Sequence, residues 1–190
     1  MNTPSHWLIT VAGAKLLRRV PPRLACGLGS IAPDLALYVL TFGGALYFTQ
    51  IQGWTTGDTF RHIFDNLYFS DPVWITLHNL LHAPIPIAIF FLISWTWWRA
   101  GNSSIARWLM YFLAACALHS VIDIFTHFDD GPLLLFPFDW TYRFSSPVSY
   151  WDPAHYGKVF MPFEAALDTA LTILLIRWSW KDRVVSDQPA

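Results

Sequence analysis

Charged residues are scarce in this chain of 190 residues. Asp, Glu, Lys and Arg together make up 13% of it, against about 25% in an average soluble domain. The formal net charge of -1 offers no basic surface for a nucleic acid. A basic segment ahead of the first apolar run is also missing, as is an A-x-A site, so we expect no cleaved signal peptide.

Cysteine is nearly absent. The chain has two, Cys26 and Cys116, and both lie in apolar stretches without a CxxC spacing. This pattern excludes a disulfide framework and favours two buried free thiols.

Apolar and aromatic residues are abundant instead. Hydrophobic residues make up 54% of the chain, with 11 Trp, 15 Phe and 7 Tyr. Amphipathic rings favour the two interfaces of a lipid bilayer. The composition therefore predicts an integral membrane protein.

Three apolar runs are strong enough to predict spanning helices: residues 73–98, 105–125 and 163–180. Pro84 and Pro86 predict a kink in the first of them. We expect one all-α domain over residues 1–190, an integral membrane helical bundle with about three full spanning helices. A long outer loop over residues 127–162 and a polar tail over residues 181–190 complete it. Residues 51–72 are expected to form a loop, with an interfacial helix within it as the alternative.

The N-terminal region predicts a short helical hairpin. Ser5 would cap a helix over residues 6–17, Pro21-Pro22 would break the chain at a basic turn, and residues 24–31 would form a second piece. At 1.5 Å per residue these pieces reach roughly 12 to 18 Å, less than the roughly 30 Å hydrocarbon core.

Residues 35–50 leave two topologies open. In one, this segment crosses the membrane and the hairpin stays inside. In the other, the hairpin dips in from outside and the segment does not cross. The distribution of Lys and Arg does not separate them, because the same residues fall inside in both. We favour the second, because it alone places His6 and Asp34 at the outer end, within reach of the other histidines.

Ionisable residues recur at helical spacing within the apolar runs. His119, Asp123 and His127 stand at i, i+4 and i+8, so they share one helix face. Such groups are costly within an apolar helix, which makes them a functional-site hypothesis.

His78 and His82 form a second i, i+4 pair on the preceding run. Two such pairs on adjacent helices would supply nitrogen and oxygen ligands for Zn²⁺, with Mn²⁺ or Fe²⁺ as alternatives. The predicted ligands are His6, Asp34, His78, His82, His119 and Asp123.

Other polar residues keep two interpretations each. His127 is a ligand, a catalytic residue or a surface residue, and Asp130, which precedes Gly131, is a catalytic residue or only a helix stop. Arg143 or Lys158 could hold a phosphate.

Glu164 and Asp168 stand at i and i+4 near the expected start of the last helix. The helix dipole alone would explain Glu164, whereas Asp168 lies deeper.

Several short motifs occur in a fixed order along residues 5–145. They are Ser5-His6-Trp7-Leu8, Gly29-Ser30-Ile31-Ala32-Pro33-Asp34, His78 with His82, His119-Ser120-Val121-Ile122-Asp123-Ile124-Phe125-Thr126, Gly131-Pro132-Leu133-Leu134-Leu135-Phe136-Pro137, and Arg143. This order resembles a bacterial family of membrane-bound metal-dependent hydrolases, the YdjM-like (LexA-binding, inner-membrane-associated) group. The resemblance implies a helical protein of the bacterial inner membrane with a His/Asp metal site. A distant likeness to zinc-dependent phospholipases C implies phosphoester substrates.

The chain departs from that family pattern in three ways, one of which is a paired-His motif that is one residue tighter than in the family. Ala36 stands where the family often has a second Asp, and Asn79 follows His78 where the family has Arg. These departures sustain a second hypothesis, a non-enzymatic membrane protein with a structural or degenerate metal site.

The first hypothesis is a hydrolase whose site faces the outer side of the membrane. One or two Zn²⁺ ions would lower the pKa of a water towards about 7 and polarise an ester. Its partners would be the lipid bilayer and a phospholipid or phosphoester substrate, and no nucleic acid.

Overall fold

The structure, a computed structural model, describes residues 1–17 and 21–186, with side chains up to residue 181, and most of these residues are helical. Within these residues no strand forms, and only one isolated bridge pairs Leu133 with Arg143. The prediction of an all-α fold is confirmed. Arg18 and Arg19 of the expected basic turn, and the last four residues of the tail, lie outside the described ranges.

Three described helices are long and apolar enough to cross a membrane: Arg23–Ile51, Ser104–Thr126 and Gly157–Lys181, with mean hydropathies of 1.5, 1.7 and 1.7. A fourth candidate is broken. Helix α5 (Pro72–Asn79) and helix α6 (Pro84–Gly101) meet at an angle of 48°. The break comes directly before Pro84, as the two prolines predict.

The N-terminal hairpin exists, but its second arm is far longer than expected. Helix α1 spans Thr3–Leu16. Helix α2 spans Arg23–Leu46 without a break at Pro33, and a π-helix, η1 (Tyr47–Ile51), follows it. The prediction of a short piece over residues 24–31 is therefore wrong. Packing against neighbouring helices holds α2 together across the missing N–H of Pro33.

The expected cap of α1 is also wrong. The helix begins at Thr3, with Pro4 in its first turn and Asn2 as its N-cap. Ser5 therefore lies inside the helix, and its hydroxyl donates to Asp168 Oδ2 at 2.8 Å.

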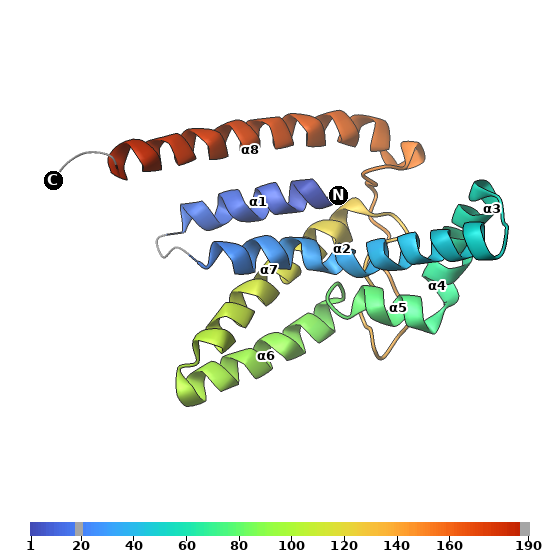
Figure 1. The fold of residues 1–190 in the computed structure, drawn as a ribbon, viewed down its shortest axis with the longest axis horizontal. Coiled ribbons are helices and arrows are strands. Elements are labelled where there is room, and N and C mark those ends of the chain that lie inside the picture. The colour runs from blue at the N-terminus through green and yellow to red at the C-terminus, as the bar shows by residue number, and fades with distance from the viewer. Residues whose placement is uncertain (18–20, 187–190) are drawn as a thin grey trace.

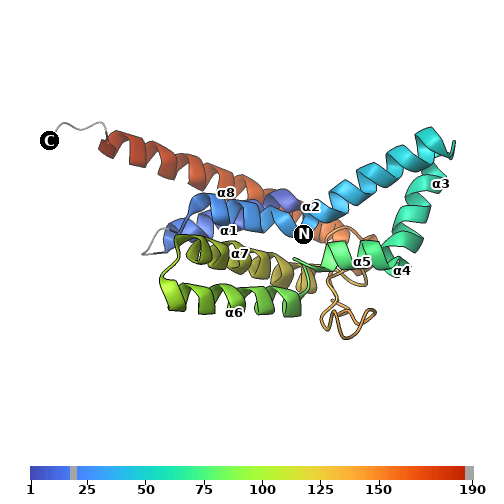
Figure 2. The same ribbon diagram turned by 60° about the horizontal axis from the view of Figure 1, so that its bottom comes forward.

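The polar segment after α2 forms short helices, which agrees with the helical alternative for residues 51–72 and not with a loop alone. They are α3 (Thr56–Arg61), the π-helix η2 (His62–Leu67) and α4 (Tyr68–Ser70). Thr55 caps α3 by accepting from the Asp58 N–H, and Asp71 caps α5. Figures 1 and 2 show the far half of α2 leaving the bundle and this segment returning the chain to α5.

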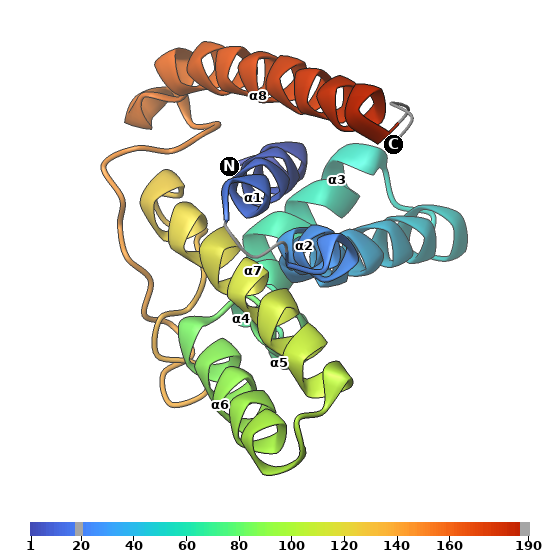
Figure 3. The ribbon, with the colours of Figure 1, turned by 90° about the vertical axis from the view of Figure 1, so that its left-hand side faces the viewer.

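Helix α7 (Ser104–Thr126) packs between α2 and α6, while α1 lies between α2 and α8, as Figure 3 shows. The contact between α2 and α7 is very close at Gly29. A Cβ added there would lie 2.1 Å from the carbonyl oxygen of Phe112, so only glycine allows this approach.

The loop after α7 is shorter than expected. It ends in a 3-10 turn, η3 (Pro153–His155), and helix α8 (Gly157–Ser186) begins where a loop was expected up to residue 162. The helix also takes in the first residues of the expected polar tail. In the apolar stretch of α8 only 6% of residues are buried, against 39% in α7, so α8 lies at the edge of the bundle.

Candidate metal centre

The carboxylate of Asp123 is the centre of a buried cluster in which four parts of the chain meet. One oxygen, Oδ1, lies 2.9 Å from His6 Nε2 on α1. The other, Oδ2, lies 3.1 Å from His82 Nε2, at the break before α6. His119, one turn before Asp123 on α7, also brings its Nε2 to 3.1 Å from Oδ2. The carboxylate thus presents separate oxygens to separate sets of imidazoles.

Asp34 adds a second carboxylate from the middle of α2. Its Oδ1 lies 3.4 Å from His119 Nε2, and its Oδ2 accepts a hydrogen bond from the Thr3 hydroxyl. The sequence-based topology that we favoured requires this meeting of α1, α2 and α7. The structure brings these residues together although α2 is one continuous helix.

The tautomer of His119 follows from its other ring nitrogen. Nδ1 lies 2.8 Å from the carbonyl oxygen of Ser30, which can only accept, so Nδ1 carries the proton. Nε2 faces the two carboxylates, 3.1 Å from Asp123 Oδ2 and 3.4 Å from Asp34 Oδ1, without a hydrogen bond of regular geometry. When the ring is neutral with this tautomer, Nε2 offers its lone pair to a metal ion. A backbone carbonyl behind a ring nitrogen is the usual support of a metal-ligating histidine.

The cluster is shielded from solvent. His6 and His119 are 0% exposed and Asp123 is 1% exposed. The rings of His6 and His119 stack with centroids 3.7 Å apart. Carboxylates are buried at low cost only when a cation or hydrogen bonds compensate them. The orphaned nitrogen, the two carboxylates and the imidazoles therefore fit a metal ion.

The cluster contains two groups of three residues. Within each group the three ligand atoms lie within 4.8 Å of one another. The groups are His6 with His119 and Asp123, and Asp34 with His82 and Asp123. Each could hold a metal ion, and Asp123 belongs to both.

His78, also predicted as a ligand, lies behind His82 rather than in either group. Its Nε2 is 2.9 Å from His82 Nδ1. The structure places it where it orients the His82 ring. The two i, i+4 pairs therefore do not contribute in the same way.

His127 and Asp130 form a pair at the edge of the cluster. His127 Nε2 lies 3.4 Å from Asp123 Oδ1, and its Nδ1 lies 3.0 Å from Asp130 Oδ1. Burial lowers the pKa of His127, but hydrogen bonds to the two carboxylates outweigh it and leave the pKa above its ordinary value.

Asp130 is held by a second donor. Trp151 Nε1 donates to its Oδ2 at 2.9 Å. Burial raises the pKa of Asp130, and the hydrogen bonds from His127 and Trp151 together with the His127 charge reverse this, so the pKa lies below its ordinary value. Asp130 therefore does more than end a helix.

Arg143 lies in the loop beside the cluster. Its Nε donates to the Gly131 carbonyl oxygen at 2.9 Å, and its guanidinium carbon lies 5.1 Å from the centre of the Phe69 ring. The guanidinium carbon also lies 5.7 Å from the centre of the Tyr68 ring, and Tyr68 donates its hydroxyl to the Asp130 carbonyl oxygen. Burial raises the pKa of Tyr68. Sequence reasoning missed Tyr68, because nothing in its local pattern marks it.

The start of the chain also reaches the cluster, which no motif indicated. The Met1 amino group lies 2.9 Å from both Asp123 Oδ1 and Thr126 Oγ1. Asn2 donates its backbone N–H and its side-chain amide to the two oxygens of Glu164, at 2.7 and 2.8 Å. The helix-dipole interpretation of Glu164 is therefore wrong, because α8 begins seven residues earlier.

Comparisons with protein-family models, with curated proteins and with solved structures find no match to this chain. The site is thus characterised by its own geometry: a buried His/Asp cluster that could hold a metal ion, with ligands on two of the three candidate membrane spans, α2 and α7.

Proposed function

We propose that this protein is a membrane-bound metal-dependent hydrolase that acts on a phosphoester or on a lipid head group. The observation that carries the proposal is the Asp123 carboxylate, which faces imidazoles with both of its oxygens. The resemblance to the YdjM-like family supports the same reaction class and the bacterial inner membrane. The distribution of Lys and Arg, most of which would lie inside, supports a site on the outer side.

The donor set suits one or two Zn²⁺ ions, with Mn²⁺ or Fe²⁺ as alternatives. His6, Asp34, His82, His119 and Asp123 would hold the metal. When bound, such an ion supplies a water of lowered pKa and a Lewis acid for the ester.

The surrounding residues have separate tasks. His127, with its raised pKa and its hydrogen bond to Asp130, is placed to donate a proton to a leaving group at the edge of the cluster. Arg143 uses one of its five N–H donors on the Gly131 carbonyl oxygen, which leaves others for a phosphate.

The test compares metal content with phosphoester hydrolysis on detergent-purified protein. Chelation should abolish hydrolysis of bis(p-nitrophenyl) phosphate or of a labelled phospholipid, and Zn²⁺ should restore it. His119→Ala should lose both the metal and the activity. The matched control is His62→Ala, because His62 lies on η2 against Phe48 and Trp54, away from the cluster. Full activity in His119→Ala would overturn the proposal.

A second function, structural metal binding without catalysis, is favoured by one observation. Three of the five ligands, His6, His119 and Asp123, are at most 1% exposed, which suits the closed geometry of structural zinc sites. This function predicts stoichiometric metal whose removal lowers Tm, with no turnover of any phosphoester at any metal loading.

A further inference from the structure

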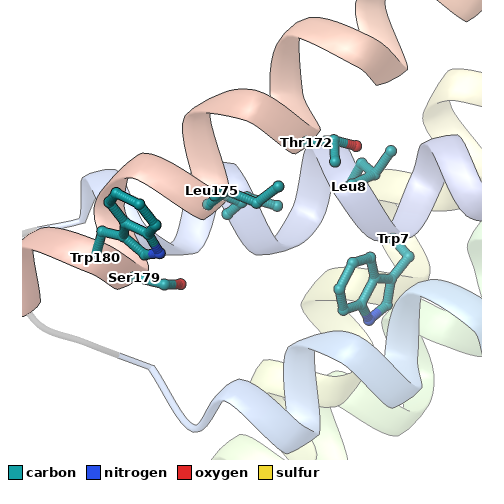
Figure 4. Close-up of a pocket in the computed structure, with 7 residues that line it drawn as sticks. Trp7, Leu8, Thr172, Leu175, Ser179 and Trp180 are labelled. Carbon is teal, nitrogen blue, oxygen red and sulfur yellow. The ribbon is translucent and has the colours of Figure 1, made fainter. Parts of the chain in front are cut away.

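A cavity lies between α1 and α8, away from the His/Asp cluster. It has a volume of about 310 Å³, and Figure 4 shows its lining. The lining residues are Trp7, Leu8, Thr172, Leu175, Ile176, Ser179 and Trp180. The walls are therefore largely aliphatic and aromatic, with two hydroxyl groups.

A second cavity, of about 160 Å³, adjoins the first, since Trp7, Leu175 and Ser179 line both. It runs toward the turn between α1 and α2, where Lys15 and Arg23 form part of its wall. Among the described lining residues of both cavities no side chain is acidic. Together they form a slot that is apolar along its length and cationic at one end.

The end of the slot that carries Lys15 and Arg23 lies at the end of the helical bundle where other basic residues also occur. Lys15 lies in the last turn of α1, and Arg23 is the first residue of α2. Arg99 lies in the last turn of α6 and Arg107 near the start of α7. Figure 1 shows the turn between these two helices at the same end of the bundle as the C-terminal end of α1. Positive residues gather on the cytoplasmic side of a membrane protein, where the leaflet carries anionic lipids.

We propose that this slot binds an anionic glycerophospholipid. One acyl chain lies between α1 and α8 against Trp7, Leu175 and Ile176, and the phosphate lies at Lys15 and Arg23. The charge of the slot selects the head group, and its apolar walls select the chain. The weak burial of α8 supports this occupant, because a helix that packs mainly on α1 leaves room for a lipid at the seam. The proposal does not depend on the metal centre.

The test is native mass spectrometry of the detergent-purified chain. The protein is titrated with phosphatidylglycerol or with phosphatidylethanolamine of the same acyl chains. The wild type should bind phosphatidylglycerol more tightly. Lys15→Gln/Arg23→Gln should weaken that binding about tenfold or more, because each of the two cations contributes to the free energy of binding an anionic lipid. The matched control is Arg99→Gln/Arg107→Gln, which removes two charges at the same end from residues that do not line the slot.

The apolar part of the slot is tested separately. Thr172→Trp places a large ring in the first cavity from an exposed position, so it should abolish lipid binding without changing any charge. Its control is Ile173→Trp, one residue along α8 at a position that is 48% exposed and outside the lining.

Four results would overturn the proposal. The first is equal binding of both lipids to the wild type. The second is undiminished phosphatidylglycerol binding to Lys15→Gln/Arg23→Gln or to Thr172→Trp. The third is competition by millimolar inorganic phosphate, which would show an anion site without a lipid chain. The fourth is a dimer in the mass spectrum that Thr172→Trp disrupts, because it would assign the slot to a second copy of the chain.

Discussion

The two ends of α1 place polar groups in opposite surroundings. At the first end His6 is fully buried, and its Nε2 has a fixed partner in Asp123. At the second end Lys15 lies beside an open apolar slot, 5.7 Å from the Trp178 ring. Buried groups require matched partners because each uncompensated one is costly, whereas a cation beside a slot tolerates exchange of partners. We therefore expect rigid, metal-dependent chemistry at one end and reversible lipid contact at the other.

The largest effect should come from Asp123→Ala. It removes the carboxylate shared by both ligand groups and leaves several buried imidazoles without their anion. Elemental mass spectrometry should find no bound metal. Breaking a buried ionic cluster also destabilises, by about 3 to 5 kcal/mol, so Tm should fall. Asp129→Ala, at an exposed neighbouring carboxylate, should change neither quantity. Metal retained by Asp123→Ala would contradict the assignment.

The next effect separates the two histidines before α6. His82→Ala removes a nitrogen 3.1 Å from Asp123, whereas His78→Ala removes only the support of the His82 ring. We expect metal affinity to fall by about 10- to 100-fold in His78→Ala, and further in His82→Ala. Competition with a chromogenic chelator measures both. Equal losses would mean that His78 is itself a ligand.

A smaller effect should appear at the edge of the cluster. Asp130→Asn removes the negative charge that faces His127 Nδ1, so turnover should fall by about 100-fold while the metal content stays unchanged. Asp129→Asn provides the control with the same chemical change. If the metal is lost together with activity, Asp130 supports the ligands rather than the proton donor.

The smallest effect concerns the attachment of α8. Glu164→Gln keeps the shape of the side chain but removes the charge that accepts two hydrogen bonds from Asn2. The free energy of unfolding should fall by about 1 to 2 kcal/mol, and hydrogen exchange in α8 should increase. The control is Thr169→Val, at an exposed position whose hydroxyl bonds only within α8. It should leave hydrogen exchange in α8 unchanged. Metal affinity that fell sharply in Glu164→Gln would show that the attachment of α8 and the metal centre are coupled.

Much of the cluster could be predicted because helical spacing puts i and i+4 on one face, which groups His119 with Asp123 without knowledge of the fold. The link between Asn2 and Glu164 could not, because 162 residues separate the two partners. The prediction that a short helix ends before Pro33 was wrong for a related reason. A proline usually ends a helix, and here the tertiary packing of α2 outweighs that local preference.

The close contact at Gly29 determines the distance between α2 and α7, and with it the spacing of the cluster residues on these two helices. The Ser30 carbonyl, one residue along α2, reaches His119 only because nothing larger than a hydrogen atom separates Gly29 from Phe112. A single methyl group at Gly29 would push two helix axes apart, and Asp34 would be moved away from His119 with them. Ligand spacing is thus a property of helix packing, and a residue without a functional group acts as its spacer.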